Sequence, residues 1–190
     1  MKLILASNSP RRKELLEKLG LRFSIISSNY KEVLFSNKPY DVAVEFALGK
    51  AKDVYNNLQN KSGVFVLGAD TVVCLGDIIL GKPIDENQAK LTLSSLSGRT
   101  HKVVTGYALL GDDFFDVGFE CSEVTFNNLS ENLINEYVKS GLYKGKAGSY
   151  GIQDGFPLVK CFSGSYDNIV GLPTEVLLPK LSIFRSNNNE

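Results

Sequence analysis

Hydroxyl and guanidinium groups stand close together near the start of the chain. They belong to the segment Leu5-Ala6-Ser7-Asn8-Ser9-Pro10-Arg11-Arg12, in which Pro10 suits the first position of a helix and Ser9 its N-cap. A helix N-terminus favours phosphate oxygens, because it offers unpaired N–H groups and a partial positive charge. Arginines in a first turn oppose the helix dipole unless an anion is bound. The pattern therefore favours an anion site over a capped surface helix with solvated arginines.

A carboxylate interrupts an apolar run later in the chain. Asp70 lies within residues 64–75, where a buried and unpaired carboxylate would be strongly unfavourable. It is either a turn aspartate that bonds its own backbone beside Gly68, or a metal ligand or general base held at a strand end. Glu32, in a polar loop, could supply a second carboxylate to a hard cation, although by itself it is only an exposed glutamate.

Two lysines could complete such a site. Lys82 comes directly after a hairpin predicted from the turn signal Gly76-Asp77, so we expect its ammonium near Asp70. Lys50 flanks the apolar face of a predicted helix. Its spacing alone favours a snorkelling side chain over one that reaches into a cleft.

A loop rich in glycine and lysine is predicted from Lys144 to Gly155. Lys144 and Lys146 make it basic, and we expect it to be flexible. The amide of Gln153 can both donate and accept hydrogen bonds, as reading the edge of a base requires. The alternative is an ordinary loop amide.

Other catalytic chemistries are disfavoured. His101 is the single histidine of the chain, and we predict a hydrogen-bonded structural role for it. Cys74, Cys121 and Cys161 have apolar sequence neighbours and are expected to be reduced core thiols. A cysteine nucleophile usually needs a histidine base, so a Cys–His dyad and a zinc cage are weak hypotheses. The sequence contains no Walker A pattern or nucleophile elbow, which leaves phosphoryl chemistry with water and a divalent metal.

Composition excludes several classes of partner. The chain has 190 residues, with 21 Lys plus Arg and 21 Asp plus Glu, so its formal charge is zero. General electrostatic attraction to nucleic acid or acidic lipid is therefore absent, and an anion site must come from local clustering. Apolar runs are too short for a membrane span, and the N-terminus lacks a signal-peptide pattern, so we expect a cytoplasmic protein. We expect one domain over residues 1–184 and a disordered tail over 185–190.

Strand and helix patterns alternate, which predicts an α/β protein. The expected strands are 3–6, 23–26, 64–67 with a continuation over 72–75 after Gly68-Ala69-Asp70-Thr71, 78–80, 103–110, 114–126, 156–162 and 168–170. Helices are expected from Pro10 to Gly20, from about Asp41, after an Asp85 cap with Gln88 as in a capping box, after Ser130, and over 173–184.

Six blocks in this order resemble the Maf family of nucleoside triphosphate pyrophosphatases. Beyond the first segment, the blocks are Leu67-Gly68-Ala69-Asp70-Thr71-Val72-Val73, Leu80-Gly81-Lys82-Pro83, Leu96-Ser97-Gly98-Arg99-Thr100-His101, Lys146-Ala147-Gly148 with Tyr150-Gly151-Ile152-Gln153, and Gly164-Ser165-Tyr166 with Val170-Gly171-Leu172-Pro173. The resemblance implies an ITPase-like α/β fold, in which an elongated, twisted mixed sheet is flanked by helices and two lobes surround a central cleft.

The resemblance also implies an activity, which is hydrolysis of a nucleoside triphosphate to the monophosphate and pyrophosphate with Mg²⁺ or Mn²⁺. Asp70 would be the proton acceptor and would share the metal with Glu32. Residues that match the family's substrate site are Ser7, Arg11, Arg12, Lys50, Thr71, Lys82 and Gln153. Arg, Thr and Gln at positions 11, 71 and 153 resemble the branch that acts on dTTP and UTP. A homodimer is implied as well.

Another class of function is a non-catalytic nucleotide-binding regulator of septum formation or cell division. The presence of Asp70, Glu32 and Lys82 argues against it, because a pure binder needs no base.

The chain also departs from the family. It has Lys31-Glu32 where the family often has two acids, Gly145 where an Asp often precedes the Lys-Ala-Gly block, and Phe46-Ala47 without the usual preceding arginine. These departures bear on metal affinity and fine substrate preference.

Overall fold

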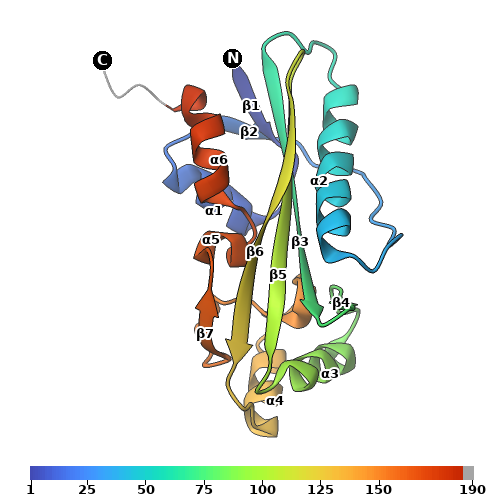
Figure 1. The fold of residues 1–190 in the computed structure, drawn as a ribbon, viewed down its shortest axis with the longest axis vertical. Helices are drawn as coiled ribbons and strands as arrows, with labels where there is room; N and C mark the ends of the chain where they lie inside the picture. The colour runs from blue at the N-terminus through green and yellow to red at the C-terminus, as the bar shows by residue number, and fades with distance from the viewer. Residues whose placement is uncertain (186–190) are drawn as a thin grey trace.

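A long mixed sheet with helices on both faces forms the frame of the molecule (Figure 1). The computed structural model describes residues 1–185. Its strands are β1 Lys2–Leu5, β2 Phe23–Ile25, β3 Val64–Leu75, β4 Ile78–Leu80, β5 Thr100–Leu110, β6 Phe115–Phe126 and β7 Val159–Ser163. Its helices are α1 Pro10–Lys18, α2 Pro39–Asn56, α3 Glu86–Leu96, α4 Glu131–Lys139, η1 Ala147–Ser149, α5 Tyr166–Val170, α6 Thr174–Leu181 and η2 Ser182–Phe184. Within these residues, no helix is long and apolar enough to cross a membrane.

The sheet combines parallel and antiparallel pairing, so the predicted mixed α/β architecture is confirmed. Its strand order is β2-β1-β3-β5-β6-β7, and β4 pairs with the far end of β3. β1 is parallel to both β2 and β3. From β3 through β5 and β6 to β7, each strand is antiparallel to the next. The long strands β3, β5 and β6 connect the two ends of the elongated molecule (Figure 1).

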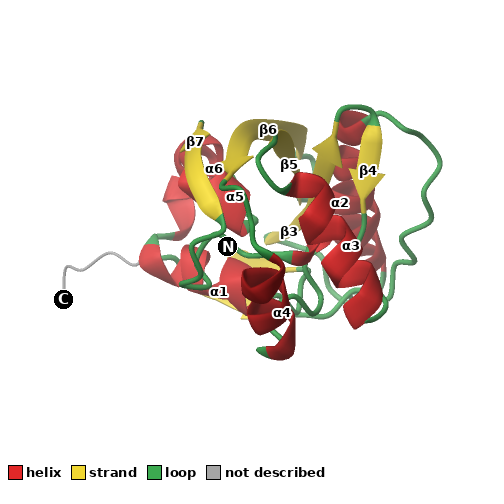
Figure 2. Cartoon of the chain, turned by 90° about the horizontal axis from the view of Figure 1, so that it is seen from below, coloured by secondary structure: helices red, strands yellow, loops and turns green. Residues whose placement is uncertain are grey.

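The two faces of the sheet are covered by different helices. α2 packs on one face, with Ala47 and Ala51 against Val66 of β3. α1 and α6 pack on the other face around Leu67 and Leu109. Successive residues of a strand point to opposite faces, so Val66 packs toward α2 and its neighbour Leu67 packs toward α1 and α6. The view along the long axis shows helices on both sides of the strands (Figure 2).

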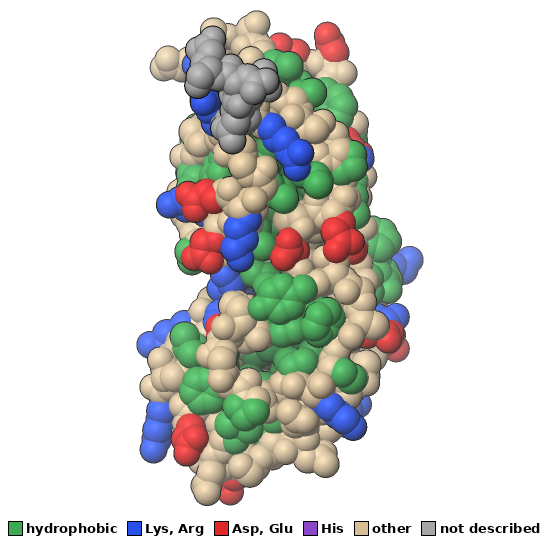
Figure 3. Space-filling view, turned by 90° about the vertical axis from the view of Figure 1, so that its left-hand side faces the viewer, with side chains coloured by type: hydrophobic (Ala, Val, Ile, Leu, Met, Phe, Trp, Pro, Cys, Tyr) green, Lys and Arg blue, Asp and Glu red, His purple; other side chains and the backbone are tan. Residues whose placement is uncertain are grey.

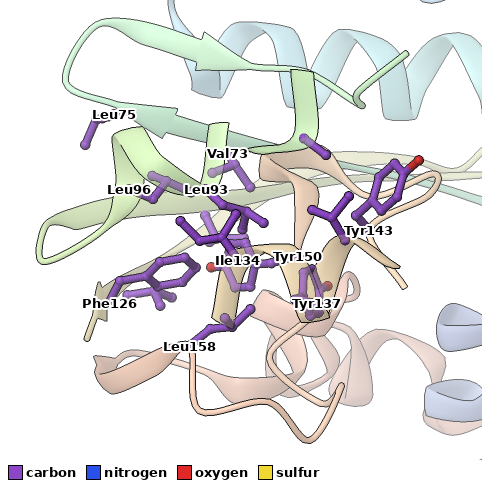
Figure 4. Packing of buried hydrophobic residues seen from close by; sticks show 14 of the residues in the cluster. Val73, Leu75, Leu93, Leu96, Phe126, Ile134, Tyr137, Tyr143, Tyr150 and Leu158 are labelled. Carbon is purple, nitrogen blue, oxygen red and sulfur yellow. The ribbon is translucent and has the colours of Figure 1, made fainter. Parts of the chain in front are cut away.

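A third core cluster fills the end of the molecule that carries α3 and α4. Buried aromatic and aliphatic side chains pack there, among them Leu93, Phe126, Tyr137 and Tyr150 (Figure 4). The ring of Tyr150 meets that of Phe126 edge on, with centroids 4.7 Å apart. This cluster supports the loop that contains Lys146 and Gln153, because Tyr150 belongs to both.

Most predicted elements are confirmed, including the Gly76-Asp77 hairpin and the caps at Ser9, Asp85 and Ser130. Gln88 departs slightly from a capping box, because its side-chain oxygen accepts from the backbone N–H of Ile84. Arg185, predicted as the first residue of a disordered tail, forms a bridge with Leu21. The remainder of the predicted tail lies outside the described residues.

Two local predictions were wrong. Residues 168–170 form the end of helix α5 instead of a strand, because Ser165 caps the helix and accepts from the N–H of Asn168. The Asn168 side chain is buried and donates to Val103 O and Ser122 Oγ, contacts that a sequence window cannot show. Cys161, expected in the core, is exposed on β7.

β7 and α5 share an apolar surface. The exposed rings of Phe162 and Tyr166 lie 6.0 Å apart there. Hydrophobic side chains gather on the face that carries these elements (Figure 3).

Candidate active site

A notch in the sheet edge forms the candidate site. β1 ends at Leu5, opposite Leu67 of β3, and β4 pairs with β3 only from Val73 onward. Residues 68–72 of β3 therefore have no strand beside them on that edge within the described part of the chain. A cleft of about 440 Å³ opens at this notch. The predicted cleft is thus placed where one strand has ended and the next has not begun.

The N-terminus of α1 faces the notch because β1 leads directly into it. The Ser9 side chain accepts from the Arg12 N–H, and the Ser9 N–H donates to Ser7 Oγ at 3.1 Å. Pro10 occupies the start of the helix, and Gly20 follows its last turn with a positive φ of 69°. These local bonds end the strand and start the helix at the cleft wall, as the sequence predicted.

Asp70 lies at the base of the cleft. It sits in the middle of β3, paired with Gly106 of β5, so the turn interpretation was wrong. The residue is only 4% exposed, and its Oδ1 lies 2.5 Å from Lys50 Nζ. Lys50 therefore reaches into the cleft, and the snorkelling interpretation was wrong as well. The sequence could not show this, because the contact depends on how closely α2 approaches β3.

Two glycines allow that approach. A Cβ on Gly68 would lie 2.2 Å from Ala47 O, and one on Gly106 would lie 2.3 Å from Ala43 O. Real side chains do not tolerate such contacts with backbone. The missing side chains, together with the small alanines of α2, bring the helix against the strands and Lys50 against Asp70. Glycine at position 68, noted in the sequence only as a turn signal, is a packing residue.

Glu32 joins the same charge cluster from the loop before α2. Its carboxylate lies 2.6 Å from Lys50 Nζ and 2.8 Å from Lys82 Nζ. Lys82 was expected beside Asp70, but its partner is Glu32, because the loop reaches across the hairpin. Burial would raise the pKa of Glu32, but hydrogen bonds from Lys50 and Lys82 outweigh it and lower the pKa to about 2. Glu32 is therefore ionised at neutral pH.

Glu32 and Asp70 are suited to share a divalent cation. Both carboxylates contact a single ammonium, that of Lys50, so they already face one positive charge. No group of three or more His, Cys, Asp and Glu able to hold a metal occurs among residues 1–185. Mg²⁺ is commonly held by one or two carboxylates together with waters and substrate phosphates. The donor set therefore fits an ion that is shared with a phosphorylated ligand.

Arg12 forms one wall of the cleft and is held by neutral acceptors. It donates to Gly171 O at 2.8 Å, and to Ser7 Oγ and Thr71 Oγ1 at 3.2 Å each. Thr105 donates its hydroxyl hydrogen to Asn168 O, so the Thr71 hydroxyl must donate to Thr105 Oγ1. Burial lowers the pKa of Arg12, and the nearby Asp70 opposes that change. Thr71, predicted to bind substrate, lines the cleft and supports Arg12.

Arg11 lies on the other side of the helix start and lines the cleft without an ion pair or hydrogen bond to the described residues. Burial lowers its pKa, and Asp154 is the strongest opposing influence. An arginine has donors in a fixed fork that suits phosphate and carboxylate oxygens. Arg11 therefore remains available to a ligand, in contrast to Arg12.

The loop at 144–155 was predicted to be basic and flexible, and one of its lysines, Lys146, is buried. Its ammonium contacts both oxygens of Asp154 at 2.5 Å, and the two side chains are only 9% and 6% exposed. Tyr137 of α4 donates to the same carboxylate at 2.6 Å. Gln153 lines the cleft beside this pair. Sequence analysis missed Asp154 and Tyr137, although an acid next to Gln153 in a lysine-rich loop was a usable signal.

His101 lies below the cleft wall and has the predicted structural role. Its Nε2 shares a 2.7 Å hydrogen bond with the hydroxyl of Tyr150, which lines the cleft. Burial lowers the pKa of His101 to about 4, so the imidazole is neutral at physiological pH. The histidine therefore supports an aromatic wall and does not reach the cleft.

The structure brings the predicted site residues together. Those that line the cleft are Ser7, Arg11, Arg12, Lys50, Asp70, Thr71, Lys82 and Gln153. Glu32 is absent from that lining but contacts Lys50 and Lys82, which belong to it. A cation-rich cleft with a buried carboxylate at its base, set in a mixed α/β sheet, defines a protein of the class that binds phosphorylated ligands.

The chain belongs to the Maf family, since the family model described as "Maf-like protein" matches residues 2–184. Similar proteins include one named dTTP/UTP pyrophosphatase from Bacillus thuringiensis subsp. konkukian (strain 97-27), 46% identical over 185 residues, which cover 96% of this chain and 95% of the relative. A protein of the same name from Bacillus cereus (strain AH820) matches equally, at 46% over 96% of this chain and 95% of its own. Another, from Bacillus cereus (strain ATCC 10987 / NRS 248), is 45% identical over 96% of this chain and 90% of its own.

Proposed function

We propose that this protein is a nucleoside triphosphate pyrophosphatase that hydrolyses dTTP and UTP, or modified pyrimidine nucleotides, to the monophosphate and pyrophosphate. The observation that carries the proposal is the buried carboxylate of Asp70 at the base of a cleft whose walls carry arginine and lysine. The names of relatives that match 96% of the chain support the choice of substrate.

Asp70 would accept the proton of the attacking water. In the proposed reaction its carboxylate orients a water molecule and accepts a proton as the water oxygen bonds to the α-phosphorus. The bond between the α-phosphorus and the bridging oxygen breaks, and pyrophosphate leaves. Arg11 and Arg12, at the helix N-terminus, stabilise negative charge on the phosphates. Lys82, which also lines the cleft, contributes to this stabilisation.

A divalent cation, Mg²⁺ or Mn²⁺, would be held by Glu32 and Asp70. When bound, it would supply positive charge that offsets the charge of the phosphates. The Lys50 ammonium contacts both of these carboxylates.

The test is a substrate panel. The protein is incubated with Mn²⁺ and each of the canonical and several modified triphosphates, and pyrophosphate, monophosphate and orthophosphate are measured separately. We expect pyrophosphate and monophosphate in equal amounts, with dTTP and UTP cleaved fastest. Cleavage of no triphosphate would favour the alternative, a non-catalytic nucleotide-binding regulator. Release of orthophosphate alone would show attack at a different phosphorus.

The family resemblance also supports a homodimer. Sedimentation velocity over a range of protein concentrations tests it, and a single species with the mass of one chain would contradict it.

A further inference from the structure

Asp154 occupies a position beside the cleft that the proposed reaction does not use. Its carboxylate is 6% exposed and accepts hydrogen bonds from several donors at once. Lys146 Nζ lies 2.5 Å from both oxygens, and the Tyr137 hydroxyl lies 2.6 Å from Oδ2. The Nε2 group of Gln153 donates to Oδ1 at 3.3 Å. Tyr137 is itself fixed in the core around α4 (Figure 4).

The contact with Gln153 determines which way its amide points. An ionised carboxylate can only accept hydrogen bonds, so the amide must turn its NH₂ group toward Asp154. The flipped amide has almost the same shape, but it would set a carbonyl oxygen against a carboxylate oxygen. Asp154 cannot turn to relieve that repulsion, because Lys146 and Tyr137 hold both of its oxygens.

The orientation of the amide matters for reading a pyrimidine. At adjacent positions of its edge, uracil or thymine presents an N3–H donor and a carbonyl acceptor at C4. Cytosine presents the reverse, an N3 acceptor and an amino donor at C4. An amide that is free to flip pairs with either base, whereas an amide held in one orientation pairs with only one of them.

We propose that Asp154 is a positioning residue for base specificity, which holds the Gln153 amide so that the cleft accepts uracil or thymine and rejects cytosine. This inference rests on the proposed function, because it assigns the base end of the nucleotide to the part of the cleft near Gln153.

The experiment measures binding with analogues that cannot be cleaved. Dissociation constants for the α,β-methylene analogues of UTP and CTP are obtained by calorimetry with Mg²⁺ for the unmodified protein and for Asp154→Asn. An Asn side chain can keep its oxygen toward Lys146 and Tyr137 and turn its NH₂ group toward Gln153, so the carboxylate no longer holds the Gln153 amide in one orientation. We expect the preference for the uracil analogue to fall about tenfold, the scale of one bidentate base contact.

A double-mutant cycle separates positioning from a general structural effect. In a Gln153→Leu background, Asp154→Asn should leave the uracil-to-cytosine ratio unchanged, because the amide through which it acts is gone. Asp116→Asn, which removes an aspartate paired with Lys180, is the matched control and should not alter the ratio. If Asp154→Asn fails to fold, Asp154→Asn with Lys146→Met removes both buried charges, and the same fall in ratio is expected.

Several results overturn the inference. One is a full uracil preference in the folded Asp154→Asn protein, and another is an equal change of ratio with and without Gln153. Equal binding of both analogues by the unmodified protein, or no binding of either, also overturns it. Failure of the proposed function looks different, since it requires that the unmodified protein cleaves no triphosphate, whereas these ratios come from analogues that cannot be cleaved.

Discussion

Two clusters of lysine and carboxylate each contribute side chains to the same cleft and differ in their most exposed members. The reaction cluster consists of Glu32, Lys50, Asp70 and Lys82, and the exposed fraction of its side chains reaches 48% at Lys82. The recognition cluster consists of Tyr137, Lys146, Gln153 and Asp154, and its ion pair is 9% and 6% exposed. Both contain as many lysines as carboxylates, so Arg11 and Arg12 supply excess positive charge to the cleft.

The difference in burial predicts a difference in behaviour. In the reaction cluster both ammonium groups contact Glu32, whose side chain is 29% exposed, so a cation or phosphate can replace these contacts at modest cost, although Asp70 is as buried as Asp154. In the recognition cluster, a lost partner leaves a buried and unpaired charge, which is strongly destabilising. One end of the cleft can therefore rearrange around a ligand, whereas the other presents a fixed surface to it.

The largest expected effect is on catalysis and comes from Asp70. Asp70→Asn keeps the shape of the side chain but removes the proton acceptor, so we expect turnover of dTTP to fall by about 10²–10⁴-fold. Pyrophosphate release with Mn²⁺ measures it, and circular dichroism checks the fold. Asp116→Asn, outside the cleft, serves as the control. An Asp70→Asn protein with more than a third of the parent turnover contradicts the role given to the reaction cluster.

The next effect is on stability and compares one lysine from each cluster. Lys146→Met leaves Asp154 buried with its ammonium partner gone, so the free energy of unfolding should fall by about 3–5 kcal/mol. Lys50→Met leaves Glu32 and Asp70 facing each other, and we expect Mn²⁺ to restore stability there, because two carboxylates offer oxygen ligands to a hard cation. Urea unfolding with Mn²⁺ and with a chelator measures both variants.

Lys13→Met provides the control for these two variants. Lys13 forms a 3.5 Å ion pair with Glu17 on the surface of α1, with both side chains about half exposed. Such pairs contribute less than about 1 kcal/mol, so this variant should unfold nearly as the parent does. Equal stabilisation of Lys50→Met and Lys146→Met by Mn²⁺ would remove the distinction between the clusters.

Local sequence signals predicted those parts of the site that are formed by residues close together in the sequence. The Ser9-Pro10 cap, the Gly76-Asp77 hairpin and a carboxylate inside an apolar run are short-range features, and each is found as a structural element. Contacts between distant segments were beyond such signals. Lys50 reaches Asp70 only because α2 approaches β3 closely at Gly68. To predict this contact, the small alanines of α2 would have to be paired with a glycine in a different element, which a local sequence pattern does not reveal.

The loop around Gln153 shows the same limit. Its composition of glycine and lysine is typical of a flexible basic loop, and the prediction followed composition. The ion pair between Lys146 and Asp154 closes that loop, and Tyr137 from α4 completes it. A buried lysine needs a partner, but the sequence does not show that Lys146 is buried while Lys144 is exposed.

The two ends of the cleft should also lose stability at different pH values, and the recognition end should lose it first as the pH falls. The pKa of His101 is lowered by burial from 6.5 to about 4, so the unfolded chain binds a proton that the folded chain does not. Stability from this group is complete above pH 6.5 and is lost as the pH falls through 4, by on the order of 3 kcal/mol. Urea unfolding between pH 7.5 and 4.5 should show a steeper loss for the parent than for His101→Gln. Parallel curves would show that His101 has the same pKa in the folded and the unfolded chain.

The smallest expected effect is a loss of stability at the reaction end, which occurs at a lower pH than the loss from His101. The pKa of Glu32 is lowered from 4.5 to about 2, where hydrogen bonds from Lys50 and Lys82 outweigh the opposing effect of burial. The stability that its ionised form contributes is therefore present above pH 4.5 and is lost as the pH falls through 2. Lys82 is half exposed, so we expect less than about 1 kcal/mol in total.

The difference in unfolding free energy between the parent and Glu32→Gln measures this contribution. With a chelator present, the difference should stay constant from pH 7 to about 4.5 and then shrink toward pH 2, because protonated Glu32 and Gln make similar contacts. Acid should thus weaken the fixed end of the cleft before the end that rearranges. A difference that already vanishes by pH 6 would mean that Glu32 is not held by Lys50 and Lys82 in solution, and the reaction cluster would then form only around a ligand.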